Sequence, residues 1–195
     1  ELVRRHRGEG LSFAQAKSFT LDEYVGLPEG HPESYQQVIR NELTTLIDIP
    51  DEHVYSPDGS TEEILTAGTR YEAAIAAAGG IDVQLLGIGS DGHIAFNEPG
   101  SSLQSRTRVK TLMEQTRVDN ARFFAGLDDV PYHAITQGLG TILDARHLVL
   151  IAAGKSKAEA VLAMVEGGLS ANCPASVLQL HQRATVFLDR EAASY

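Results

Sequence analysis

The feature that most constrains the fold is a regular alternation of short apolar runs with segments of helical periodicity. Residues 83–88 and 147–152 are apolar runs of the length expected for buried strands. Before the first of them, residues 64–78 carry apolar side chains at helical spacing and end at Gly79-Gly80, a common helix terminator. Strands that alternate with helices in this way predict a Rossmann-like α/β fold, with a mostly parallel twisted sheet flanked by helices.

The rest of the chain follows the same pattern. Further strands are expected at residues 17–21, 108–112 and 184–188, and further helices at residues 32–46, 114–124, 135–145 and 156–166. Two sequences, Ser60-Thr61-Glu62-Glu63 and Ser156-Lys157-Ala158-Glu159, match the capping box that starts a helix. Since ligands bind at the carboxyl ends of strands in such sheets, chemistry is expected at residues 22–24, 89–98 and 154–157.

Composition limits the class of protein. The 195 residues, 43% of them hydrophobic, suit a single domain, residues 1–195. A formal net charge of −10 argues against a nucleic-acid partner, although an acidic protein can still bind an anionic small molecule in a locally positive site. We expect no membrane segment and no signal peptide, and the single cysteine, Cys173, allows no internal disulfide. These features together predict a cytoplasmic protein.

The start of the chain is unusual for such a domain. Residues 1–10 read as the end of a helix followed by a turn, and a compact α/β domain rarely opens there. We therefore expect a further segment upstream of Glu1.

Two glycine motifs resemble nucleotide-binding sequences but fail on context. Gly87-Ile88-Gly89-Ser90-Asp91-Gly92 fits the dinucleotide fingerprint, yet loop-forming residues follow where a helix should begin. Gly154-Lys155-Ser156 resembles the end of a phosphate-binding P-loop, but the residue five positions earlier is Val149 instead of glycine. The second motif still predicts a helix N-terminus that favours an anion, with Lys157 in its first turn. The alternative is that Lys157 is an ordinary solvated surface residue.

Asp91, His93 and Glu98 form the constellation with the most chemical content. They lie in one polar loop directly after an expected strand. A carboxylate bonded to one ring nitrogen of a histidine fixes its tautomer and leaves the other nitrogen free to move a proton near neutral pH. The alternative is a structural histidine bonded to the loop backbone.

Three further sets of residues each allow a functional and an ordinary structural interpretation. Asp22, at the end of the first expected strand, is a general base or the cap of a turn. Arg122 binds phosphate or packs its stem over Phe123 or Phe124. The six other histidines have no carboxylate at ligand-like spacing, so we expect surface or capping roles for them and no metal site.

At these residues the sequence resembles the glucosamine-6-phosphate deaminase family, also called glucosamine-6-phosphate isomerases. Residues 19–27 resemble the segment that carries the proton-abstracting aspartate, and residues 86–99 resemble the signature segment. Residues 107–111, 120–124, 154–157 and 178–181 resemble further family segments in the same order. The resemblance covers nearly the whole chain and implies a fold of the sugar-phosphate isomerase type.

The resemblance implies roles for individual residues. His93 would open the sugar ring with Asp91 and Glu98 orienting it, and Asp22 would move a proton between C2 and C1. Arg122 and Lys157 would bind the phosphate of the substrate. In some members, residues that match Ser101, Arg108, Lys110 and Thr111 bind an allosteric acetylated sugar phosphate. The family uses no metal or organic cofactor and forms homo-oligomers, often hexamers.

Two departures and two alternatives accompany the resemblance. The family begins with a strand, a helix and a phosphate-binding loop that have no counterpart here, so the 195-residue chain alone is expected to be poorly active. A C-terminal tail that some members use in regulation also has no counterpart.

The related 6-phosphogluconolactonases share the Gly-x-Gly-x-Asp-Gly-His stretch and offer a second activity. A non-catalytic sugar-phosphate sensor is the third interpretation.

Overall fold

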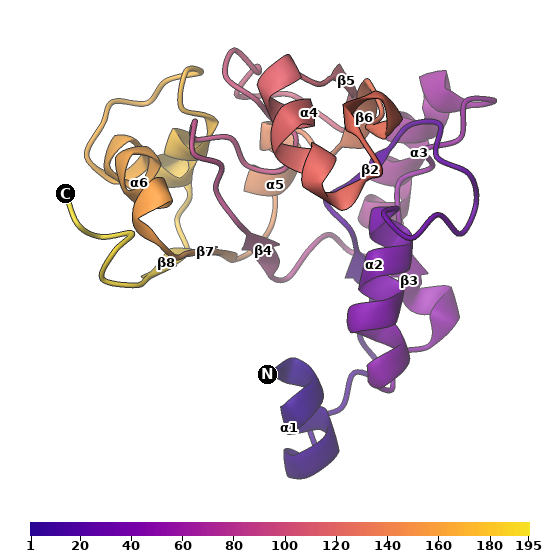
Figure 1. The fold of residues 1–195 in the computed structure, drawn as a ribbon. Helices are drawn as coiled ribbons and strands as arrows, with labels where there is room; N and C mark the ends of the chain where they lie inside the picture. The colour runs from indigo at the N-terminus through magenta and orange to yellow at the C-terminus, as the bar shows by residue number, and fades with distance from the viewer.

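The structure is a computed structural model that describes residues 1–195, and it confirms the α/β class (Figure 1). The helices are α1 (Leu2–Glu9), α2 (Tyr35–Glu42), α3 (Ile64–Ala77), α4 (Glu114–Asn120), α5 (Leu139–Leu143) and α6 (Ala158–Val165). The strands are β1 (Ser18–Phe19), β2 (Asp22–Tyr24), β3 (Val54–Tyr55), β4 (Gln84–Leu86), β5 (Arg108–Thr111), β6 (His133–Thr136), β7 (Leu148–Ala152) and β8 (Ala184–Leu188).

The strands form three small sheets. Two of them, β1-β3 and β4-β7-β8, are parallel as expected. The third, β2-β6-β5, is antiparallel and was not expected. It corrects the prediction of one helix at residues 135–145, because residues 133–136 satisfy their backbone hydrogen bonds by pairing with β2 on one side and β5 on the other. Only the second half of that segment forms a helix, α5.

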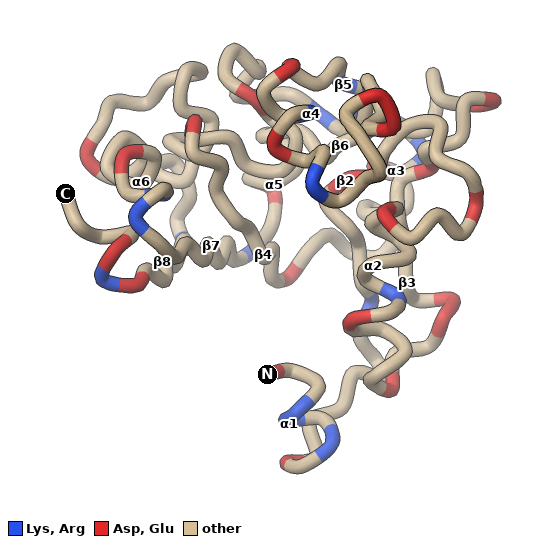
Figure 2. Tube along the Cα trace, viewed as in Figure 1, with Lys and Arg blue, Asp and Glu red and all other residues tan.

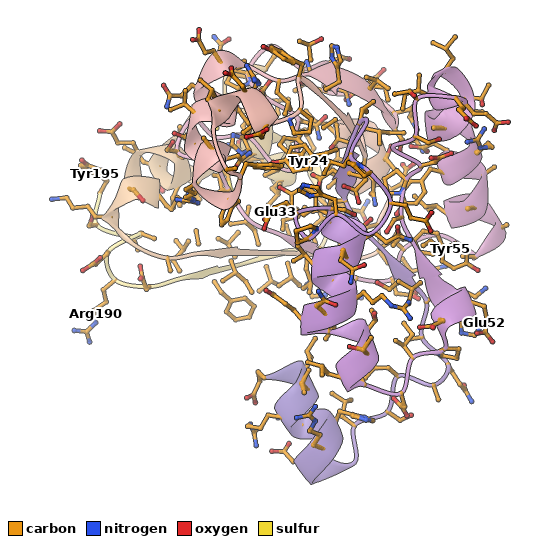
Figure 3. The ribbon with its side chains drawn as sticks, turned by 45° about the vertical axis from the view of Figure 1, so that its right-hand side comes forward. Tyr24, Glu33, Glu52, Tyr55, Arg190 and Tyr195 are labelled. Atoms are coloured by element: carbon orange, nitrogen blue, oxygen red, sulfur yellow. The ribbon has the colours of Figure 1, made fainter.

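Two apolar cores position the rest of the molecule. The larger has 17 buried residues, among them Leu150 of β7, Ile142 of α5 and Met164 of α6. The smaller consists of Tyr24, Phe96, Leu112 and Ala134 and lies on the antiparallel sheet. Figure 3 shows Tyr24 among closely packed side chains, whereas Arg190 and Tyr195 extend outward near the C-terminus.

The parallel sheet β4-β7-β8 is covered on one face only. Leu85, Ile151 and Phe187 are 53%, 57% and 57% exposed, whereas Leu86 and Leu150 on the opposite face are buried. The expectation that residues 83–88 and 147–152 are fully buried strands is therefore wrong for one face. The reason is that α5 and α6 both pack on the same side of this sheet (Figure 1).

Neither predicted capping box forms. Helix α3 begins at Ile64, after Glu63, and no side chain caps it. At the second box a 3-10 turn, η5 (Lys155–Lys157), precedes α6, again without a side-chain cap. The expected Gly-Gly end of α3 is confirmed, because Gly79 and Gly80 have φ of 91° and 87°, a conformation that favours glycine.

Charged residues are spread over the molecule (Figure 2). Helix α1 is rich in arginine, and its Arg4 and Arg5 pair with Glu1 and Glu9. None of the helices combines the length and the apolar character that crossing a membrane requires.

Glu72 joins helix α3 to helix α5 and to the segment before β5, and it is expected to matter for stability. From α3 it accepts hydrogen bonds from the N–H and hydroxyl of Thr107, from Thr141 of α5 and from Arg106. Burial by itself raises the pKa of Glu72, but these hydrogen bonds outweigh it and hold the pKa below its ordinary value. We expect Glu72→Gln to lower the free energy of unfolding by about 2 kcal/mol at pH 7.

The pH dependence follows from the direction of that pKa. A carboxyl with a depressed folded-state pKa stabilises the fold above its unfolded pKa, and the contribution is lost as pH falls through the folded one. Urea unfolding should therefore show a difference at pH 7 that shrinks below about pH 4. Glu62→Gln, an exposed glutamate without an ion pair, is the matched control. Equal stabilities of the two variants at pH 7 would contradict this role of Glu72.

Candidate active site

The His93 loop, residues 89–98, carries the predicted constellation after β4. The Nδ1 atom of His93 lies 2.6 Å from Oδ1 of Asp91, and the same oxygen accepts the backbone N–H of His93 at 3.1 Å. Since Asp91 holds Nδ1, the Nε2 atom of the ring is left to exchange a proton. Ala95 in this loop has a φ of 51°, which a residue other than glycine adopts only where the surroundings impose it.

Two glycines of the dinucleotide-like motif have other tasks here. A Cβ atom on Gly89 would lie 2.2 Å from Cε1 of His93, so Gly89 leaves the space that the imidazole occupies. Gly92 has a φ of 84°, and a Cβ atom there would lie 2.7 Å from the sulfur of the buried Cys173. The glycines therefore shape a loop that seats a histidine, which explains why no helix follows them.

Asp22 lies on β2, and the backbone of the His93 loop contacts it. In the sheet, Asp22 is opposite Thr136 of β6, whose hydroxyl lies 3.2 Å from the backbone nitrogen of Phe96. Burial raises the pKa of Asp22 to about 7, the charge of Glu23 adds to the rise, and a hydrogen bond from the N–H of Phe96 opposes it. A carboxyl whose pKa lies near the working pH suits a general base.

The hydrogen-bond partners of the Glu98 carboxylate lie at the start of α4. This carboxylate is 2% exposed and accepts hydrogen bonds from the N–H of Met113 and the hydroxyl of Thr116. No hydrogen bond joins it to His93, whose carboxylate partner is Asp91. Glu98 thus ties the end of the His93 loop to α4, which runs on into the 3-10 turn η3 (Ala121–Phe123).

The two predicted phosphate-binding residues have no acidic partner. Arg122 of η3 is exposed and its guanidinium lies 4.7 Å above the ring of Phe123. Lys157 is half-buried at the end of η5. The backbone N–H of Gly154, directly before this turn, donates to the carboxylate of Asp189 at 3.0 Å. The anion site expected at the helix start that follows stays a prediction.

The four residues of the implied allosteric site lie on strand β5 and in the loop that follows Glu98. Strand geometry places Arg108 and Lys110 on one face of β5 and Thr111 on the other. Arg108 donates to the side-chain oxygen of Asn97 at 2.9 Å. Ser101 is 2% exposed and its hydroxyl donates to the carbonyl oxygen of Glu98. An allosteric role for this set stays a prediction.

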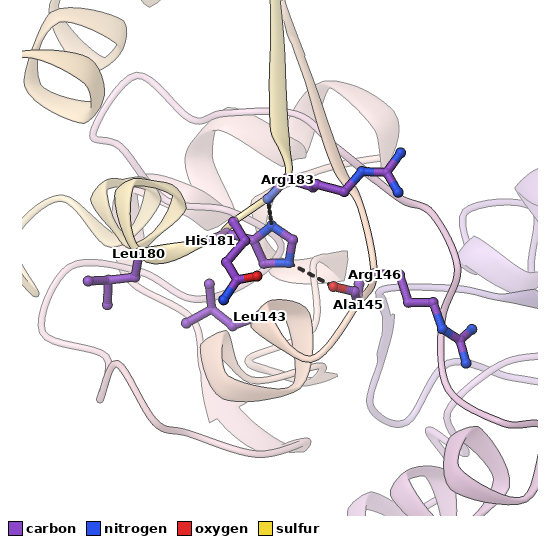
Figure 4. Close-up of a pocket in the computed structure, with 7 residues that line it drawn as sticks. Leu143, Ala145, Arg146, Leu180, His181 and Arg183 are labelled. Atoms are coloured by element: carbon purple, nitrogen blue, oxygen red, sulfur yellow. Dashed lines mark hydrogen bonds between the residues drawn. The ribbon is translucent and has the colours of Figure 1, made fainter.

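A cavity of about 400 Å³ lies away from these residues, between Ala145-Arg146 and residues 180–183 (Figure 4). His181 lines it, and both of its ring nitrogens are occupied, one 2.7 Å from the oxygen of Ala145 and the other 3.0 Å from the nitrogen of Arg183. This agrees with the capping role expected of His181. No group of three or more His, Cys, Asp or Glu side chains could hold a metal ion.

Three residues of this region received no individual site role from the sequence. Thr136 bridges β6 and the His93 loop, Gly89 makes room for the imidazole, and Glu23 anchors the strand of Asp22. Gly89 was visible as a glycine shortly before a histidine. Thr136 carried no signal, because its segment has helical spacing, and Glu23 contacts residues that lie further along the chain.

Comparison with known proteins assigns the chain to a family. The sequence model of the family described as glucosamine-6-phosphate isomerases/6-phosphogluconolactonase matches residues 1–187. A glucosamine-6-phosphate deaminase of Rhodococcus opacus is 65% identical over 194 residues, which cover 100% of this chain and 75% of that protein. One of Mycolicibacterium smegmatis is 61% identical over 99% of this chain and 74% of that protein.

Solved structures agree with the family. A structure described as a monomeric glucosamine-6-phosphate deaminase superposes with a TM-score of 0.96 at 46% identity, over 99% of this chain and 80% of that one. A 6-phosphogluconolactonase of Trypanosoma brucei reaches a TM-score of 0.75 at 22% identity, over 99% of this chain and 80% of that one, and so supports the fold alone.

Proposed function

This chain belongs to the family of glucosamine-6-phosphate isomerases and 6-phosphogluconolactonases, and on that premise we propose that it converts glucosamine 6-phosphate and water to fructose 6-phosphate and ammonia. The observation that carries the proposal is Asp22, a carboxyl with a pKa of about 7 against the backbone of the His93 loop. An aldose–ketose conversion needs a group that accepts a proton from carbon and returns it, and such a group works best with its pKa near the working pH.

The residues divide the reaction into steps. His93, held by Asp91, moves the proton that opens the sugar ring. Asp22 removes the proton from C2 of the open chain, which gives an enol-type intermediate, and returns it to C1. Water then replaces the nitrogen at C2, ammonia leaves, and the ketone of fructose 6-phosphate remains. Arg122 and Lys157, to which the family resemblance assigns the phosphate, neutralise its charge, and the exposed guanidinium of Arg122 suits a bidentate contact.

The substrate test compares two sugar phosphates. We expect ammonia and fructose 6-phosphate from glucosamine 6-phosphate, and little hydrolysis of 6-phosphogluconolactone, in a coupled ammonia assay run beside a lactonase assay. The 195-residue chain should be assayed on both substrates under the same conditions. Lactone hydrolysis without ammonia release would favour the lactonase, and tight binding of the sugar phosphate without any turnover would favour a sensor.

Location and assembly are part of the proposal. A chain with one cysteine and a sugar-phosphate substrate suits the cytoplasm. The family resemblance favours a homo-oligomer, whereas one solved relative is described as monomeric. Light scattering across a concentration series decides between the two.

A further inference from the structure

Glu23 is a buried carboxylate with no part in the reaction described above. It is 6% exposed, and it accepts four hydrogen bonds at the start of α2 and in its own strand. One oxygen accepts the N–H groups of Tyr24 and Tyr35 at 2.8 and 3.1 Å. The other accepts the hydroxyl of Ser34 at 2.8 Å and the N–H of Gln36 at 2.9 Å. A charge is buried in this way only when its hydrogen-bonding capacity is met.

Strand geometry puts Glu23 and Asp22 on opposite faces of β2. Successive side chains of a strand point to opposite faces, so the face of Asp22 also carries Thr136 and Arg108, which lie in the same row of the sheet. Glu23 lies on the other face, where α2 begins. Gly59 closes that side, because a Cβ atom there would lie 2.2 Å from the oxygen of Tyr24 and 3.2 Å from Cγ of Glu23.

We propose, given the function proposed above, that Glu23 is a positioning residue for the reaction. Its carboxylate links the middle of β2 to the first turn of α2. This link keeps the Asp22 carboxyl next to the backbone N–H of Phe96 in the His93 loop. The strand has only three residues, so it has few ladder hydrogen bonds of its own to fix its position. The N-terminal end of α2 also favours a negative charge at this point.

The charge of Glu23 acts on Asp22 as well. It adds to the effect of burial in raising the pKa of Asp22. The hydroxyl groups of the nearby tyrosines stay protonated and neutral near pH 7. Burial raises the pKa of Tyr24 to about 12 and raises the pKa values of Tyr35 and Tyr71 further. Arg108 of β5 lies in the same row of the sheet as Asp22, and Glu23 is the charged side chain that adds to the rise in the pKa of Asp22.

The test is Glu23→Gln, which removes the charge and leaves one acceptor atom for four donors. We expect the pKa of Asp22, followed by carboxyl ¹³C NMR, to fall by about one pH unit. The acid limb of the pH profile of kcat should move lower by the same amount. We expect kcat/KM to fall roughly tenfold because Asp22 is misplaced. Glu29→Gln, an exposed glutamate close in sequence, is the matched control and should change neither.

A second variant separates the charge from the anchor. Glu23→Asp keeps the charge but shortens the reach to α2, so Asp22 should titrate near its original pH while kcat/KM falls. An Asp22 titration and a kcat/KM that both stay at parental values in Glu23→Gln would overturn the inference, even if the melting temperature dropped. An enzyme that releases no ammonia would instead overturn the proposed function, and the NMR titration would still test the effect of Glu23 on Asp22.

Discussion

Replacing Asp22 by asparagine is expected to lower kcat by about 10²- to 10⁴-fold, the usual contribution of a general base. The amide cannot accept a proton from C2, although its oxygen can still accept the hydrogen bond from the N–H of Phe96. Substrate binding should change little, because the phosphate is assigned to Arg122 and Lys157. The measurement is ammonia release at saturating glucosamine 6-phosphate, with direct binding of the substrate followed by calorimetry.

The same substitution should make the protein more stable. Burial raises the pKa of Asp22 from 3.8 to about 7 in the folded state, so the folded protein holds a proton that the unfolded chain gives up near pH 4. Between these values stability falls as pH rises, because the folded state binds more protons than the unfolded one. A neutral amide at this position carries no such cost, and we expect Asp22→Asn to add roughly 2–4 kcal/mol to the free energy of unfolding at pH 8.

The pH window makes this prediction specific. The gain should be largest above about pH 7, decrease between about pH 7 and pH 4, and vanish below that range, where Asp22 is protonated in both states. Asp51→Asn is the control, since Asp51 is an exposed residue that pairs with Arg40. Its neighbour Glu52 lies well apart from Tyr24 in Figure 3. Loss of both activity and stability in Asp22→Asn at pH 8 would show that Asp22 has a structural role instead.

The sequence predicted the elements whose signals are local. Helix α3 follows from apolar residues at helical spacing and a Gly-Gly end, and β4, β7 and β8 follow from apolar runs. The His93 loop and its Asp91–His93 contact also follow from neighbouring residues, because a carboxylate two positions before a histidine can reach its ring. These features depend on short-range geometry, which a single sequence contains.

What the sequence did not predict depends on distant partners. The segment of strand β6 resembles part of a helix because Ile135 and Leu139 lie at helical spacing, while its real partners, β2 and β5, lie far away in the chain. The two capping-box sequences show the converse, because a local pattern was present and no cap formed: α3 begins after Glu63 and α6 after Lys157, without a side-chain cap at either start. Glu23 and Glu98 cap helices that begin more than ten residues further on, so no local motif marks them.

Glu98 gives the second large expected effect. Glu98→Ala removes a buried charged acceptor and leaves the N–H of Met113 and the hydroxyl of Thr116 without a partner. We expect a loss of about 3 kcal/mol in the free energy of unfolding. We also expect a fall of roughly 100-fold in kcat/KM, because the His93 loop and the segment that carries Arg122 lose their common anchor.

Thr116→Val distinguishes an anchor from a proton relay. It keeps the Glu98 carboxylate and the shape of residue 116, but it removes the hydroxyl that joins Glu98 to α4. If Glu98 acts through α4, as the structure indicates, this variant should reproduce a substantial part of the loss in kcat/KM. If Glu98 acts on His93 directly, Thr116→Val should turn over like the parent while Glu98→Gln does not. Parental activity in Thr116→Val would therefore contradict the anchoring role of Glu98 and support the direct role beside His93 that the family resemblance implies.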